Sequence, residues 1–245
     1  MRVLDQTTIE VPSGQFLAIV GPSGCGKTTL LNMVSGLVVP ETGQVMLNGA
    51  PPRIGAPNVG YLFARDALLP WRTAAGNISL ALEFRNVPAK ERKVIISRQL
   101  KAVGLTDFAN AYPSQLSHGM RQRIALARTL APGPDTLLMD EPFAALDAQT
   151  RLVLQEQFVN LWEDVGSTVI FVTHDLAEAV ALADRVVVMS RRPGHIKAEF
   201  NVDLKRPRRV TELQGNSSFH HLFERIWKVF QEEVMQHHDG TQRGS

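Results

Sequence analysis

Short apolar runs alternate along this chain with longer segments whose apolar residues recur every three or four positions. Each short run ends at a glycine or a polar residue and is too short for a typical helix, so these runs predict buried strands. They span residues 16–20, 136–139, 168–172 and 185–190. Nearly continuous apolar runs are typical of parallel strands that are covered on both faces. With a helix near 148–165 between two of them, the pattern indicates an α/β fold.

Two stretches follow other patterns. From about 64 to 130 the spacing is helical, as in Ile96, Leu100 and Val103, which recur at i, i+4 and i+7. Upstream, the turn Glu41–Gly43 is followed by the apolar residues Val45–Leu47, which predict a hairpin strand.

The C-terminal part is a polar segment with one amphipathic helix, expected over Ser217–Gln236, which Asn216, Ser217 or Ser218 could cap. Its apolar stripe consists of Phe219, Leu222, Phe223, Ile226, Trp227, Phe230 and Val234. We expect this stripe to pack on its own domain, and docking of a partner is the alternative. For the basic run Lys205–Arg209, a solvated loop is favoured over contact with anionic lipid headgroups.

The segment Gly21–Thr28 carries the strongest chemical signal, because it fits the pattern G-x-x-x-x-G-K-[ST] between a strand and a helix. It comprises Gly21, Pro22, Ser23, Gly24, Cys25, Gly26, Lys27 and Thr28, and Thr29 begins the helical run. Backbone N–H groups of such a loop point at phosphate oxygens, the lysine reaches the terminal phosphates and the threonine hydroxyl ligates Mg²⁺. A glycine-rich turn that binds nothing is the alternative. The loop predicts a nucleoside triphosphate site.

Polar residues also end two other predicted strands. Asp140 and Glu141 follow one of them, and His174 follows another. In parallel sheets, ligands bind beyond the carboxyl ends of the strands, so these groups are expected near the same phosphates. Asp140 would hold Mg²⁺ and Glu141 would orient or deprotonate the attacking water. His174 would donate to the γ-phosphate, and a capping or surface role is its alternative.

A second anion site is predicted where Leu116–Arg123 opens a helix that runs to about Leu130. Ser117 and the free N–H groups of the helix start would bind an anion. Within one chain this site duplicates the phosphate loop. Two copies arranged head to tail would place each helix start against the nucleotide of the other copy.

Composition narrows the class of protein only slightly. The 245 residues carry a formal net charge of +2, which is too small to argue for nucleic acid as a partner. Cys25 is the only cysteine, so a disulfide framework is excluded, in agreement with a reducing cytosol. No apolar run approaches the ~20 residues of a membrane span, and residues 1–6 show no secretory signal pattern.

Taken together, these segments resemble the ATP-binding subunits of ABC transporters. The matching motifs are Gly21–Thr28 (Walker A), Leu116–Met120 (signature), Leu137–Glu141 (Walker B), Ala145–Asp147 (D-loop) and His174 (switch histidine). The resemblance runs from about residue 3 to 200. Within the family, Ala67–Trp71, Pro142–Asp147 and Met189–Gly194 are similar to importers of nitrate, sulfonate, taurine and related small compounds.

The resemblance implies a P-loop NTPase fold with a mixed, mainly parallel sheet, a small antiparallel β subdomain and an inserted helical subdomain. One domain would span 1–245, with its core at 1–63 and 131–200, the helical subdomain at about 64–130 and a helical tail at about 201–245.

The resemblance also implies a mechanism in which two subunits, identical or different, enclose two ATP molecules with Mg²⁺. Lys27, Glu141 and His174 would be catalytic, while Ser117, Gly119 and Asp147 would contact the bound nucleotides across the pair. Closure would move a separate permease that is served by an extracytoplasmic solute-binding protein, so the chain would lie on the cytoplasmic face of the inner membrane. Residues 64–75 would receive the permease, and Trp71 there would either dock or pack internally.

Three positions depart from the family pattern. Ala64 stands where a glutamine is expected, and His118 replaces the first glycine of the signature. The only aromatic residue before Gly21 is Phe16, although the family stacks an aromatic side chain on adenine from an earlier strand. These departures keep open a regulatory subunit that binds ATP but hydrolyses it poorly in a heterodimer. An ABC ATPase of repair or translation, or a phosphate-loop kinase, has less support, since no coiled-coil insertion, tandem site or acceptor motif is visible.

Overall fold

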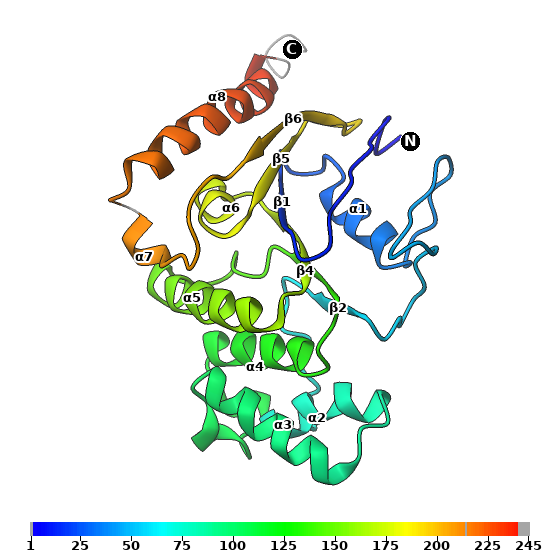
Figure 1. Cartoon of the computed structure of the whole chain (residues 1–245), viewed down its shortest axis with the longest axis vertical. Helices are drawn as coiled ribbons and strands as arrows, with labels where there is room; N and C mark the ends of the chain where they lie inside the picture. The colour runs from blue at the N-terminus through cyan, green and yellow to red at the C-terminus, as the bar shows by residue number, and fades with distance from the viewer. Residues whose placement is uncertain (1, 214, 240–245) are drawn as a thin grey trace. The chain divides into compact units, whose positions relative to one another are not determined.

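The computed structural model describes residues 2–213 and 215–239 (Figure 1). The chain forms two compact units. Unit 1 combines Met1–Ala56 with Thr168–Ser245, and unit 2 is Pro57–Ser167. Residues 1, 214 and 240–245 of the predicted domain lie outside the described residues, and its subdomain boundaries stay a prediction.

Unit 1 is built on four strands whose order is β4-β1-β5-β6. They are β1 (Phe16–Val20), β4 (Thr168–Thr173), β5 (Arg185–Met189) and β6 (Ile196–Asn201). β1 pairs in parallel with β4 and β5, and β6 pairs antiparallel with β5. Every residue of β1 is buried, as its unbroken apolar pattern predicts. Strand β6 was not predicted, and its side chains alternate between partly buried and exposed.

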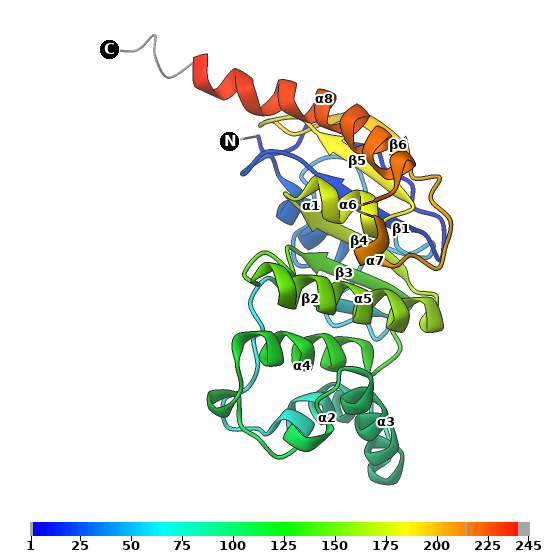
Figure 2. The same cartoon turned by 90° about the vertical axis from the view of Figure 1, so that its left-hand side faces the viewer.

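Four helices complete unit 1: α1 (Lys27–Val34), α6 (Leu176–Leu182), α7 (Val210–Leu213) and α8 (Ser217–Asp239). α8 packs on α6 and lies beside β5 and β6 (Figure 2). Its buried residues Phe219, Ile226 and Phe230 belong to the predicted stripe, so packing on its own domain is confirmed. The Asn216 side chain accepts a hydrogen bond from the Phe219 N–H at 3.1 Å and caps the helix.

The basic run is used inside unit 1. Arg206 pairs with the Asp184 carboxylate at 2.8 Å, and the buried Arg208 donates to the carbonyl oxygens of Ala183, Val202 and Leu204. The interpretations as a solvated loop or a lipid contact are therefore wrong for Arg206 and Arg208. Both guanidinium groups find acceptors far away in sequence, which satisfies the charge that burial would otherwise penalise.

Unit 2 holds the strands β2 (Val59–Leu62) and β3 (Thr136–Asp140), which pair in parallel. Its helices are α2 (Ala74–Phe84), α3 (Ala89–Ala102), α4 (His118–Leu130) and α5 (Ala148–Val165), with 3-10 turns η1 (Thr106–Phe108) and η2 (Pro113–Gln115). α2 and α3 pack on α4. The helical pattern is confirmed, whereas the short β2 was not predicted.

The hairpin strand predicted over Val45–Leu47 is wrong. Only an isolated bridge forms between Leu47 and Ala50, closed by Asn48 and Gly49, which both have positive φ. Proline follows at 51 and 52, and without N–H groups these residues cannot extend the ladder. Antiparallel pairing in the described part of unit 1 is thus represented by β5–β6 and by this bridge.

Candidate functional site

The predicted phosphate loop connects β1 to α1, as expected. Gly24 and Gly26 have φ values of 77° and 109°, which side-chain-bearing residues rarely adopt. A Cβ on Gly26 would also lie 2.6 Å from the Leu4 Cδ2 atom. Gly26 forms the N-cap of α1 without any side-chain hydrogen bond, so backbone N–H groups supply the polarity of this helix start.

Lys27 lies at the centre of this loop with only 6% of its surface exposed. Its Nζ donates to the carbonyl oxygens of Gly21 at 2.7 Å and Pro22 at 3.0 Å. These bonds satisfy a buried ammonium group with acceptors that belong to the loop itself. The neighbouring Cys25 is buried, and burial raises the pKa of its thiol, so Cys25 is a packing residue rather than a reactive one.

His174 leaves the sheet beside this loop. The register of β1 with β4 places Val20 opposite Thr173, so Gly21 and His174 follow adjacent strands at one edge. Helix α6 is capped by Asp175, whose carboxylate accepts from the N–H groups of Ala177 at 2.8 Å and Glu178 at 3.2 Å. The capping alternative for His174 is therefore wrong, and its side chain is exposed at the sheet edge.

In unit 2, β3 ends at Asp140 and the chain turns at Glu141, whose φ is 45°. A residue with a side chain costs about 1–2 kcal/mol in this region, so its surroundings must hold it there. The Ala144 N–H donates to the Glu141 carbonyl oxygen at 3.2 Å, and Phe143 is fully buried against Phe158. The turn thus fixes the Glu141 backbone through a buried aromatic anchor.

The charge of Asp140 acts on a neighbouring strand. Tyr61 of β2 lies opposite Leu138 of β3, and its pKa is raised by burial and by the Asp140 carboxylate. The phenol therefore stays neutral at physiological pH.

The predicted signature and D-loop residues meet at the starts of two helices that pack together, α4 and α5. Ser117 caps α4 by accepting from the Met120 N–H at 3.3 Å, and Asp147 caps α5 by accepting from the Thr150 N–H at 3.0 Å. A Cβ on Gly119 would lie 2.6 Å from the Thr150 Cγ2 atom, so a larger residue there would displace the Thr150 side chain. Thr150 therefore links Asp147 to Gly119.

The pattern did not single out Thr150. The sequence feature that could have identified it is its position in the first turn of α5, where a backbone N–H bonds to the N-cap side chain. This hydrogen bond lowers the pKa of Asp147, because it stabilises the carboxylate form.

A comparison with protein families decides the identity. A family model described as "ABC transporter" matches residues 4–144, from upstream of the phosphate loop to just beyond Glu141. The chain belongs to the ABC transporter family. It is an ABC transporter ATP-binding subunit, as the combination of motifs predicts.

Curated ABC relatives match most of the chain. An uncharacterized ABC transporter ATP-binding protein of Methanocaldococcus jannaschii is 46% identical over 96% of this chain and 86% of that protein. A taurine import ATP-binding protein of Rhizobium johnstonii is 42% identical over 84% of this chain and 79% of that protein. A nitrate import ATP-binding protein of Synechococcus elongatus is 42% identical over 84% and 76%, respectively.

A solved ABC structure supports the fold. A dimeric ATP-binding cassette in a post-hydrolysis state, bound to ADP and phosphate, has a TM-score of 0.72 and 31% sequence identity. The match covers 83% of this chain and 92% of that one. The predicted ABC ATPase fold is therefore confirmed.

The structure shows the surroundings of the residues that depart from the ABC pattern and of Trp71. His118 does not have positive φ, so the backbone at this position does not require the glycine of the family signature. Ala64 is exposed, and its carbonyl oxygen accepts a hydrogen bond from the Gln122 side chain. Trp71 is 71% exposed, so the alternative of internal packing is wrong. Phe16 is fully buried against Phe171, and it is not placed to stack on a base.

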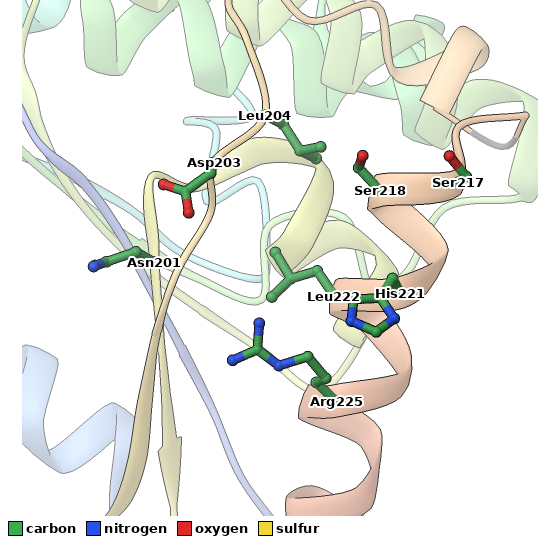
Figure 3. Close-up of a pocket in the computed structure, with 8 residues that line it drawn as sticks. All are labelled: Asn201, Asp203, Leu204, Ser217, Ser218, His221, Leu222 and Arg225. Atoms are coloured by element: carbon green, nitrogen blue, oxygen red, sulfur yellow. The ribbon is translucent and has the colours of Figure 1, made fainter.

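Outside these motifs, unit 1 has an open hollow of about 410 Å³ between β6 and α8 (Figure 3). It is lined by Asn201, Asp203, Leu204, Ser217, Ser218, His221, Leu222 and Arg225. The Arg225 guanidinium lies 5.8 Å from the centroid of the Phe200 ring, so it contributes to the packing of α8 on β6. None of the predicted nucleotide-site residues lines this hollow.

The described residues contain no cluster of three or more His, Cys, Asp or Glu side chains placed to hold a metal. Within the same part of the chain, no helix combines the length and the apolar character that crossing a bilayer requires.

Proposed function

We propose that this chain is the ATP-hydrolysing subunit of an importer, in which a dimer of ATP-binding subunits drives a small solute through a separate permease. The support is its family together with relatives named for taurine and nitrate import. A small solute of the nitrate, sulfonate or taurine kind is the proposed cargo.

The phosphate loop would bind ATP. Lys27 holds the Gly21 and Pro22 carbonyl oxygens now, and it would exchange them for phosphate oxygens, which are stronger acceptors because they are charged. Residues Gly21–Thr29 supply the surrounding N–H and hydroxyl groups.

Hard oxygen ligands suit Mg²⁺, and the Thr28 hydroxyl and Asp140 carboxylate are of this kind, so the residues present fit that ion. When bound, Mg²⁺ would neutralise charge on the β- and γ-phosphates. Glu141 would orient or deprotonate the attacking water, and His174 would donate to the γ-phosphate.

A second ATP-binding subunit, identical or related, would complete each site. Ser117, Gly119 and Asp147 lie at the starts of α4 and α5, and they are the groups proposed to contact the nucleotides across the pair. The solved relative is a dimer, which supports this arrangement.

The permease would dock on residues 64–75, where Trp71 offers an exposed aromatic surface. A solute-binding protein would act through the permease without touching this chain. The subunit would then work at the cytoplasmic face of the inner membrane.

The observation that carries the proposal is the loop between β1 and α1, with Lys27 buried at its centre and His174 at the same sheet edge. The test is Mg²⁺-dependent ATP hydrolysis by the purified chain. Lys27→Ala and Glu141→Gln should each lower kcat by about 100-fold or more, since each removes a group proposed to act on the reacting phosphate.

The matched controls are Lys228→Ala and Glu224→Gln, two exposed positions on α8 that should leave turnover unchanged. Hydrolysis that is insensitive to Glu141→Gln would overturn its role. Nucleotide-dependent dimerisation without turnover would instead identify a regulatory subunit.

A further inference from the structure

Helix α4 forms hydrogen bonds with the loop that follows β2, and both elements lie in unit 2. Gln122 is only 2% exposed, and its Nε2 donates to the Ala64 carbonyl oxygen at 2.9 Å. Arg128 donates to the carbonyl oxygens of Asp66 at 2.9 Å and Ala67 at 2.8 Å. The loop is thus held through its backbone, and these contacts do not depend on the side chain at position 64.

Arg121 contacts both this loop and the turn that contains Ser117. Its Nε pairs with the Asp66 carboxylate at 3.0 Å, and its Nη1 donates to the Leu116 carbonyl oxygen at 2.8 Å. Its Nη2 lies 3.4 Å from the Nδ1 atom of His118. One planar guanidinium therefore contacts the loop and the residues on both sides of Ser117 through three different nitrogens, whose relative positions are fixed by the plane of the group.

We propose that Arg121, supported by Gln122 and Arg128, is a positioning residue that makes the loop at 64–67 and the turn at 116–118 move together. These three side chains are called the α4 clamp. A displacement of the loop would then be transmitted to Ser117 through the guanidinium of Arg121. The consequence for turnover rests on the proposed function, because Ser117 affects hydrolysis only if it contacts a nucleotide.

Hydrogen–deuterium exchange tests the mechanical link without any turnover. The Leu68 N–H bonds to the Asp66 carboxylate, and the Met120 N–H bonds to Ser117, so these two amides report on the two ends. Arg121→Lys keeps the positive charge but loses the planar fork, and it should speed exchange at both amides.

Arg123→Lys is the matched control, because Arg123 lies on the same helix and donates to the Val103 carbonyl oxygen rather than to the loop. It should leave the Leu68 and Met120 amides unchanged. Faster exchange at Met120 alone, with Leu68 unaffected in Arg121→Lys, would overturn the link.

Steady-state kinetics test its consequence. Arg121→Lys should lower kcat about tenfold while KM for ATP changes less than about twofold, because the phosphate loop that first binds ATP is intact. A purely stabilising role would lower the melting temperature and leave the kcat of the folded fraction unchanged, which would overturn the positioning role.

A double-mutant cycle with Asp66→Ala and Arg121→Ala gives the second kinetic arm. The double variant should be no slower than the slower single variant, since both break one connection. Independent, additive losses would contradict the link. If the wild type does not hydrolyse ATP, the proposed function fails while the exchange experiment still decides the link.

Discussion

The phosphate loop and the signature turn are held in opposite ways. In the first, Lys27 bonds to carbonyl oxygens that are five and six positions away in sequence. In the second, Arg121 and Gln122 bond to residues 55 and 58 positions away. The buried lysine of the first is therefore satisfied by carbonyl oxygens of its own loop, whereas the second depends on a distant loop. The groups proposed to bind phosphate are thus held by residues close to them in sequence, whereas the turn that contains Ser117 is held by a segment far away in sequence.

The largest effect is expected from Gly26→Ala, in the phosphate loop. The substitution combines a positive φ with a Cβ 2.6 Å from Leu4, so it should destabilise unit 1 and lower ATP affinity at least about tenfold. Urea unfolding and titration with a fluorescent ATP analogue would measure both effects.

Gly55→Ala is the matched control, because it has positive φ but no atom within 4 Å of the added Cβ. It should cost only about 1–2 kcal/mol of unfolding free energy and leave ATP affinity unchanged. Equal effects of the two substitutions would show that backbone strain alone, rather than the close contact, explains the loop.

A smaller effect is expected where α4 meets α5. Gly119→Ala places a Cβ 2.6 Å from the Thr150 Cγ2 atom and should cost about 1–3 kcal/mol. Thr150→Ser removes that methyl group and keeps the hydroxyl and the N–H that caps with Asp147. The double variant should therefore regain most of the lost stability in thermal unfolding. No recovery would mean that Gly119 is needed for another reason.

The smallest effect concerns the pH dependence of Asp147. Its pKa is lowered in the folded chain by the Thr150 N–H. The contribution of this carboxylate to stability is therefore present above the ordinary aspartate pKa and is lost as the pH falls through the pKa of the folded state. The Asp147→Asn variant should be less stable than the wild type at pH 7, and this difference in the free energy of unfolding should shrink as the pH falls to 3. A difference that stays constant with pH would show that the charge of Asp147 does not contribute.

Several features could be predicted because their causes are local. The unbroken apolar run of β1, the helix start next to Ser117 and the amphipathic stripe of α8 all formed where expected. Strand β6 was missed because its half-exposed alternation gives a weak apolar signal. The hairpin strand predicted at 45–47 does not form. The prolines that stop its ladder lie outside the predicted strand, so the apolar pattern of that strand did not reveal them.

The amino-acid order was enough to predict a phosphate loop and to propose which residues carry chemistry, since such a loop and a helix cap depend on neighbours within a few positions. It could not reveal which groups hold those residues in place. Asp184 binds Arg206, and Asp66 binds Arg121, across 22 and 55 positions. Such pairs form only when the folded backbone brings two remote segments within hydrogen-bonding distance, so only the tertiary structure decides how the signature turn is held.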